Sequence, residues 1–194
     1  MRSEIAIADP LNLVSGRVHE AEGRDRRTFS LLQAVRHRGP VIWIVPDHAP
    51  ERPMPCGLPQ GVVERLLIVT PGNEADLLWC LEESLRSRPV GLVIAEPERA
   101  LSLTAGRRFQ LAAEAGRTTG LLLIREGQGS NAAETRWHCE ALPGAADSTP
   151  HRWSLKKNKK GTLGSWTVHW NGATAACHLV PEARERHESQ GAPD

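Results

Sequence analysis

The segment VHEAEGRDRRTFSLLQA (18–34) carries hydroxyl and basic side chains that could bind phosphate. A phosphate-binding loop between a strand and a helix follows the pattern GxxxxGK and then Ser or Thr, because its glycines turn backbone N–H groups inward and its lysine contacts phosphate oxygens. In this alignment Thr28 takes the hydroxyl position and Arg27 the lysine position, but Arg26 stands where the second glycine belongs. A side chain there resists the required backbone conformation, and arginine is a poor substitute for this lysine. The pattern predicts at most a degenerate phosphate-binding loop, and an exposed charged loop before a helix explains it more simply.

Acidic residues follow two other apolar runs of the chain. Asp47 and His48 come after VIWIVP (41–46), and Glu96 comes after GLVIA (91–95). A carboxylate at the end of a strand can hold Mg²⁺ through water, and Asp47 with His48 could activate a water molecule. An ordinary turn or loop explains these residues more simply, so Asp47 and Glu96 are candidates for a catalytic role and no more.

The four lysines of the chain all lie in one short run, KKNKK (156–160), whereas the other 20 of its 24 basic residues are arginine. Such a run could use compact ammonium groups at a site, but a solvated charge run at the edge of a hairpin is the simpler interpretation. Together with Arg152 these lysines could neutralise a few phosphates in a weak, sequence-independent DNA contact. The net charge of +1 argues against strong general DNA binding.

The elements that must position these residues can be predicted from apolar runs. Four continuous runs predict strands buried on both faces of a parallel sheet: 40–46, 65–72, 90–97 and 120–126. Helices are expected between them, one beginning near Thr28, one capped by Asn73, and one capped by Thr104 and ending at Gly116. Strands that alternate with helices indicate βαβ units and a doubly wound α/β fold.

The pattern changes after about residue 130. The segments 134–142, 151–159 and 165–171 alternate polar with apolar or aromatic residues, which predicts half-exposed antiparallel strands joined by turns at 161–164 and 171–172. Four of the six tryptophans lie here, and most of the six are expected in the core, with any exposed one a candidate contact for a protein partner. Residues 181–194 have almost no apolar content and are expected to be disordered.

Length and composition limit the classes of protein to which this chain can belong. A length of 194 residues predicts one domain, and no apolar run approaches the roughly 18 residues of a membrane span. The N-terminus has no pattern of a secretion signal, and the four scattered cysteines form no CxxC pair. We therefore expect a cytoplasmic protein without a membrane contact. The eight histidines show no regular ligand spacing, so no metal site is expected.

The order of these motifs resembles the RecA ATPase core, from about Val18 to His178. In this resemblance Asp47 takes the place of the water-activating acid, and 90–101 matches the strand of the Mg²⁺-binding acid, here Glu96. The segment 153–161 resembles a hairpin whose lysine pair, here Lys157 and Lys159, contacts the nucleotide of a neighbouring subunit in RecA filaments. The resemblance implies a RecA-like P-loop NTPase core with a mainly parallel sheet, flanking helices and a C-terminal antiparallel extension.

The departures from RecA point to a shorter relative. The segment between Ile124 and Thr135 is too short for the long DNA-pairing loop of RecA, and the phosphate-binding loop is degraded. A C-terminal domain like that of RecA is not expected. With the stretches 103–123 and 132–141 and a Trp-rich closing hairpin, the chain is identified as a member of the ImuA family. That family implies a scaffold in SOS-induced, error-prone translesion DNA synthesis, with an ImuB-like Y-family protein, RecA and an error-prone DnaE-type polymerase as partners.

This resemblance implies three segments: an N-terminal extension (1–17), a RecA-like domain (18–180) and the tail (181–194). It implies a pseudo-ATPase without a cofactor, although ATP and Mg²⁺ stay open as ligands. The nucleotide contacts, if any, would be Arg27 and Thr28, with Lys157 and Lys159. Two alternatives remain: a weak ATP-binding switch or ATPase in DNA repair, and a cell-division inhibitor similar to SulA.

Overall fold

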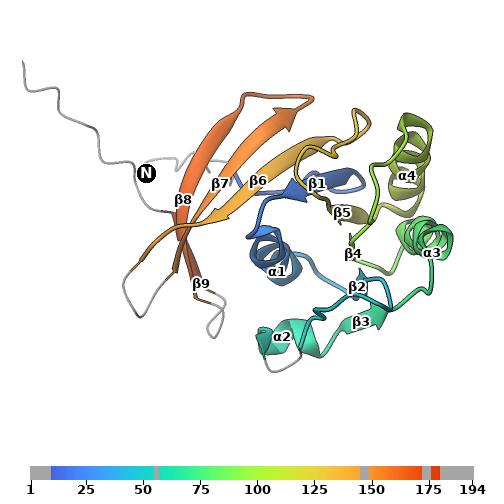
Figure 1. Cartoon of the computed structure of the whole chain (residues 1–194), viewed down its shortest axis with the longest axis horizontal. Helices are drawn as coiled ribbons and strands as arrows, with labels where there is room; N and C mark the ends of the chain where they lie inside the picture. Colours follow the sequence, from blue (N-terminus) through green and yellow to red (C-terminus); the bar gives the residue numbers. More distant parts are fainter. Residues whose placement is uncertain (1–9, 55–56, 145–148, 172–175, 180–194) are drawn as a thin grey trace, which may run out of the picture.

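The computed structural model describes residues 10–54, 57–144, 149–171 and 176–179, and within these ranges the chain forms an α/β fold around one mixed sheet (Figure 1). The strands follow the order β3-β2-β4-β5-β1-β6-β7-β8-β9, in which the first six are parallel and the last three are added antiparallel. The parallel strands are β1 (Val18–Glu22), β2 (Val41–Ile44), β3 (Leu66–Val69), β4 (Leu92–Ala95), β5 (Thr119–Leu123) and β6 (Thr135–Ala141). The predicted α/β class, with a parallel sheet and an antiparallel extension, is confirmed.

Helices cover both faces of the sheet (Figure 1). Helix α1 (Arg26–Arg36) buries Phe29 and Leu32 against one face, where Trp43, Leu121 and Trp137 also lie, and the short α2 (Gln60–Val63) joins them there. Helices α3 (Glu74–Arg86) and α4 (Leu103–Gly116) pack on the other face. Because the strands β2, β4 and β5 are buried on both sides, their sequences are apolar runs without alternation. Strand β1 is buried as well, although it carries His19, Glu20 and Glu22.

Two details differ from the sequence-based expectation. Strand β3 was expected to be buried on both faces, but it is the edge strand, and its side chains Leu67 and Ile68 are 57% and 39% exposed. An apolar run of four residues cannot distinguish an edge position from a central one. Helix α4 is capped by Ser102, whose Oγ accepts a hydrogen bond from the Ala105 N–H at 3.1 Å, and not by Thr104, which lies inside the helix. The predicted cap of α3 is confirmed, since Asn73 Oδ1 accepts from the Asp76 N–H at 3.0 Å.

The antiparallel strands β7 (Thr149–Asn158), β8 (Gly164–Asn171) and β9 (Ala176–Leu179) continue the sheet beyond β6. Trp137 of β6 and Trp153 of β7 point inward and contact Phe29 of α1, with ring centroids 5.1 Å apart in both pairs. The predicted alternation therefore places one row of side chains in the core that α1 shares with the parallel strands. Of the six tryptophans, Trp79 on α3 is the exposed one, at 65%.

The chain before β1 packs on the core, because Leu11 is buried and its carbonyl accepts a hydrogen bond from the Gln33 side chain at 2.8 Å. The predicted tail, 181–194, lies outside the described residues, as does part of the turn at 171–172. Among the helices that the structure describes, none has both the length and the apolar character to cross a membrane.

Candidate functional site

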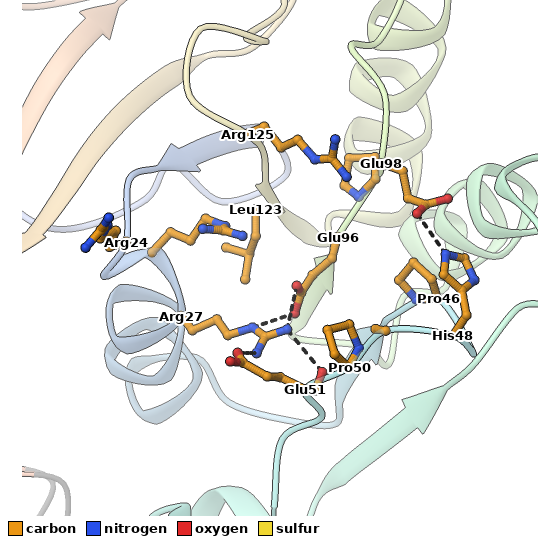
Figure 2. Close-up of a pocket in the computed structure, with 13 residues that line it drawn as sticks. Arg24, Arg27, Pro46, His48, Pro50, Glu51, Glu96, Glu98, Leu123 and Arg125 are labelled. Carbon is orange, nitrogen blue, oxygen red and sulfur yellow. Dashed lines mark hydrogen bonds and ion pairs between the residues drawn. The ribbon is translucent and has the colours of Figure 1, made fainter.

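The loops that leave the carboxyl ends of β1, β2, β4 and β5 enclose a cavity of about 380 Å³ (Figure 2). We call it the strand-end cavity. Its lining includes Arg24, Arg26 and Arg27 after β1, Glu51 after β2, Glu96 after β4 and Arg125 after β5. The carboxyl edge of a parallel sheet is where α/β proteins bind ligands, so this cavity is the place to look for the predicted chemistry.

The guanidinium of Arg27 is held between two carboxylates (Figure 2). Its Nε and Nη2 donate to the two oxygens of Glu96 at 3.1 and 2.9 Å, and its Nη1 donates to Glu51 at 2.8 Å. Glu96 is nearly buried, with a side chain 11% exposed, and it also accepts a hydrogen bond from the Trp43 indole at 3.0 Å. The residue at the lysine position of a phosphate-binding loop is thus paired with carboxylates of the protein itself, in the planar two-point geometry that suits guanidinium.

The loop between β1 and α1 is fixed by contacts with β6 and with the first antiparallel strand, β7. Gly23 has φ +89°, and a Cβ at this position would lie 2.3 Å from the carbonyl oxygen of Cys139 on β6. The next turn of the loop is tied to the same carbonyl by the N–H of Asp25, at 3.1 Å. The buried carboxylate of Asp25 accepts from His151 Nδ1 at 2.7 Å and from Trp153 Nε1 at 3.0 Å. The shape of the loop therefore follows from its packing on β6 and β7.

Three further arginines surround the cavity without a carboxylate partner among the described residues: Arg24, Arg26 and Arg125. Arg26 donates from Nη1 to the Gly23 carbonyl at 3.0 Å, while its buried Nε has no hydrogen-bond partner there. The N-terminus of α1 adds partial positive charge, because Asp25 uses its side chain on β7 and provides no side-chain cap. The rim of the cavity is therefore electropositive, while its interior is neutralised by Glu51 and Glu96.

Asp47 lies at the outer side of the site, half-exposed, and accepts from His48 Nδ1 at 3.1 Å. The other ring nitrogen of His48 contacts Glu98 at 2.8 Å. The hydrogen bonds to Glu98 and Asp47 raise the pKa of His48. Thr28 sits within α1 and does not line the strand-end cavity.

The two predicted lysines lie elsewhere. Lys157 Nζ donates to the carbonyls of Ser130 and Asn131 at 3.2 and 2.7 Å, and Lys159 Nζ donates to the carbonyl of Ala132 at 2.7 Å. Burial lowers the pKa of Lys157. Both amines hold the segment before β6 in place, on the side of the molecule where α4 packs.

Of the candidates named from the sequence, the fold brings Arg27 and Glu96 together and leaves Asp47, Thr28 and the lysine pair apart from them. The sequence analysis missed Glu51, although its place in the loop after a predicted strand was the available signal. It also missed the buried pairing of Asp25 with His151, which are 126 positions apart. Across the described ranges, no three His, Cys, Asp or Glu side chains gather as a metal-ion site would require.

The protonation state of Arg27 limits the chemistry that the strand-end cavity can perform. A guanidinium stays protonated at neutral pH and has no acceptor, so Arg27 can anchor or orient an anion but cannot act as a base. Glu96, the carboxylate expected from the sequence to hold Mg²⁺, is paired with Arg27, as is Glu51. The residues of the strand-end cavity therefore do not fit Mg²⁺ with a triphosphate as they stand.

Known proteins resemble this chain in sequence. No protein-family model matches it. The Protein ImuA of Caulobacter vibrioides is 30% identical over 153 residues, a stretch that covers 69% of this chain, and the same match is found in two strains. The chain spans 61% of the length of these curated relatives. The agreement of this match with the motif order places the chain in the ImuA family.

Proposed function

We propose that this chain is a RecA-like, non-catalytic accessory protein of SOS-induced, error-prone translesion DNA synthesis, which acts as a scaffold. The observation that carries the non-catalytic part is the pairing of Arg27 with Glu96 and Glu51. In an ATPase of this kind, Arg27 would have to bind phosphate and Glu96 would have to bind Mg²⁺. Here the two side chains bind each other instead. Each of the two groups needed for hydrolysis is held by the other.

Membership of the ImuA family supports the biological setting of the proposal. The proposed partners are an ImuB-like Y-family protein, RecA and an error-prone DnaE-type polymerase. The RecA-like nature of the core is supported by a parallel sheet with helices on both faces, followed by an antiparallel extension that carries the lysine run. A scaffold needs a rigid body with free surfaces, and the exposed side chains of Trp79 and Leu111 are consistent with that role.

A nucleotide-binding switch is the second candidate, and one observation favours it. Arg24, Arg26 and Arg125 lie around a cavity of about 380 Å³ and have no carboxylate partner in the described part of the chain. Phosphate groups of ATP could bind these arginines if the carboxylates released Arg27.

Binding of fluorescent ATP with Mg²⁺ to the purified protein separates the two candidates. We expect no saturable binding below millimolar concentration for the wild type. The variant Glu51→Gln/Glu96→Gln frees Arg27, so it should bind triphosphate at least about tenfold more tightly. The variant Glu83→Gln/Glu114→Gln makes the same charge change on α3 and α4 and should behave as the wild type.

Micromolar binding of ATP by the wild type would favour the switch over a scaffold that works without nucleotide, and slow turnover that Glu96→Ala abolishes would overturn the non-catalytic part of the proposal. The scaffold part has its own measurement. The purified chain should elute together with an ImuB-like protein in size-exclusion chromatography without nucleotide. Separate elution of the two proteins, with and without ATP, would contradict a scaffold.

A further inference from the structure

A groove of about 500 Å³ lies between α4 and the segment before β6, and none of its lining residues belongs to the strand-end cavity. We call it the α4 groove. Leu103, Arg107 and Leu111 follow one another at intervals of four residues and so form one stripe along α4. Both leucines are exposed, at 47% and 66%, so the fold leaves much of their apolar surface uncovered.

The walls of the groove are fixed by hydrogen bonds. The amide nitrogen of Gln110 donates to the carbonyls of Val18 and Ala132 at 2.9 and 3.1 Å, which ties α4 to the sheet and to the segment before β6. Lys159 Nζ reaches the same carbonyl of Ala132 from β7's end, at 2.7 Å. Gly106 lets the helix approach this wall closely, because a Cβ there would lie 2.7 Å from that of Ala132. A preformed groove costs little ordering free energy when a ligand binds.

The charge of the groove is positive. Its lining holds three cations, Arg17, Arg107 and Lys159, and one carboxylate, Glu114, which pairs with Arg17 at 3.0 Å. Arg107 has no ion pair within the described residues. The hydrogen bond of Lys159 is to a neutral carbonyl, so its charge is not compensated. The lysine run thus has one member at the rim of an apolar groove.

The chemistry of the occupant follows from this combination. Proteins that bind single-stranded nucleic acid combine a basic groove with aromatic rings on which the bases stack, and no aromatic side chain lines the α4 groove. An apolar floor with a basic rim matches a helix that presents apolar side chains on one face and carboxylates beside them. The stripe from Leu103 to Leu111 is about 12 Å long at 1.5 Å per residue, which suits about two turns of such a helix.

We propose that the α4 groove is the docking site for an acidic amphipathic helix of a partner protein. This inference rests on the scaffold proposal above and adds to it the surface and the kind of segment that it recognises. Arg107 and Lys159 would pair with the carboxylates, while Leu103 and Leu111 would cover the apolar face of the partner.

A displayed library of helical peptides of about 16 residues, randomised at surface positions, tests the inference on the full chain. Selection on the wild type should enrich peptides with net negative charge and apolar residues at spacings of three and four. A labelled peptide from this selection should lose at least about tenfold in affinity to Leu111→Asp and to Arg107→Glu. The matched controls, Leu163→Asp and Arg99→Glu, change exposed residues outside the groove and should bind within about twofold of the wild type.

A charge-exchanged peptide, with Lys in place of its acidic residues, should bind Arg107→Glu better than it binds the wild type. A merely structural role of Arg107 would not produce that exchange. Enrichment of peptides without acidic residues, no enrichment, or unchanged affinity for Leu111→Asp would overturn the inference, as would tighter binding of a single-stranded oligonucleotide that Arg107→Glu abolishes. These binding measurements contain no ATP and no translesion protein, so their failure leaves the scaffold proposal to be decided by its own tests.

Discussion

Arg27 shows how one side chain can change what a strand-end site does. A lysine at this position offers a point charge on a flexible stem, whereas arginine offers a planar fork that can contact two carboxylates at once. Here the fork spans Glu96 and Glu51, at 2.9 and 2.8 Å. Because Glu96 is nearly buried, its charge needs this partner. Through its two ion pairs, Arg27 of α1 connects the loop after β4 with the loop after β2. The residue at the expected ligand-binding position thereby becomes a bridge between elements.

His19 makes a prediction about pH. Burial lowers its pKa to about 4, from 6.5 in the unfolded chain, while its ring contacts Thr135 Oγ1 at 2.7 Å. Between these two values the unfolded state binds a proton that the folded state does not, so the free energy of unfolding falls as the pH falls. At roughly 1.4 kcal/mol per pH unit the full loss is on the order of 3 kcal/mol.

Urea unfolding from pH 7 down to about pH 4 measures this effect, within the window that the two pKa values set. The variant His19→Gln should show a flatter dependence on pH than the wild type, even if it is less stable at pH 7. The control His178→Gln, at an exposed position on β9, should keep the wild-type dependence. Parallel curves for His19→Gln and the wild type would rule out His19 as the source.

At the scale of elements, the position of α4 depends on Gly106. A methyl group at this residue would lie 2.7 Å from the Cβ of Ala132 and 2.8 Å from Ser130 Oγ. Gly106→Ala gains about 1 kcal/mol in helix propensity but must push α4 from the segment before β6, which costs about 1–3 kcal/mol. We expect a net loss of stability in denaturant unfolding. Gly61→Ala in α2 is the matched control, since a Cβ there meets nothing within 4 Å, and it should be neutral or stabilising.

The elements that the sequence predicted best are those with a strong local signal. Continuous apolar runs predicted β2, β4 and β5, because a strand buried on both faces needs apolar side chains at successive positions. Alternation of polar and apolar residues predicted β6 to β8, because a strand buried on one face needs apolar side chains at every second position. An edge strand and a central strand can have the same sequence pattern, because they differ only in whether another strand lies beside them. The exposure of β3 was therefore not predictable. For the site, the parallel sheet made it predictable that Arg27 and Glu96 would lie at one edge. Their pairing was not, because it depends on rotamers and loop paths that no periodicity encodes.

At the scale of the whole molecule, the positive charges occupy two separate places. The strand-end cavity has its cations around a neutralised interior, whereas the α4 groove has its cations around an apolar floor. Since the chain as a whole carries a net charge of only +1, these two places stand out by local concentration and not by overall charge. A protein that brings others together benefits from this division, because partners with different chemistry can bind without competing.

The antiparallel extension and the parallel part should unfold together. Phe29 of α1 contacts Trp137 and Trp153, and Asp25 hydrogen-bonds to His151, so the two parts share one core and one buried polar pair. In the variant Trp43→Phe/Trp79→Phe/Trp137→Phe, the remaining tryptophans all belong to β7 and β8, while helix circular dichroism reports on α1, α3 and α4. The midpoints of urea unfolding from the two signals should coincide, as for a two-state domain. Two separated transitions would instead mean that the extension is a unit of its own, and the segment 18–180 would not be a single domain.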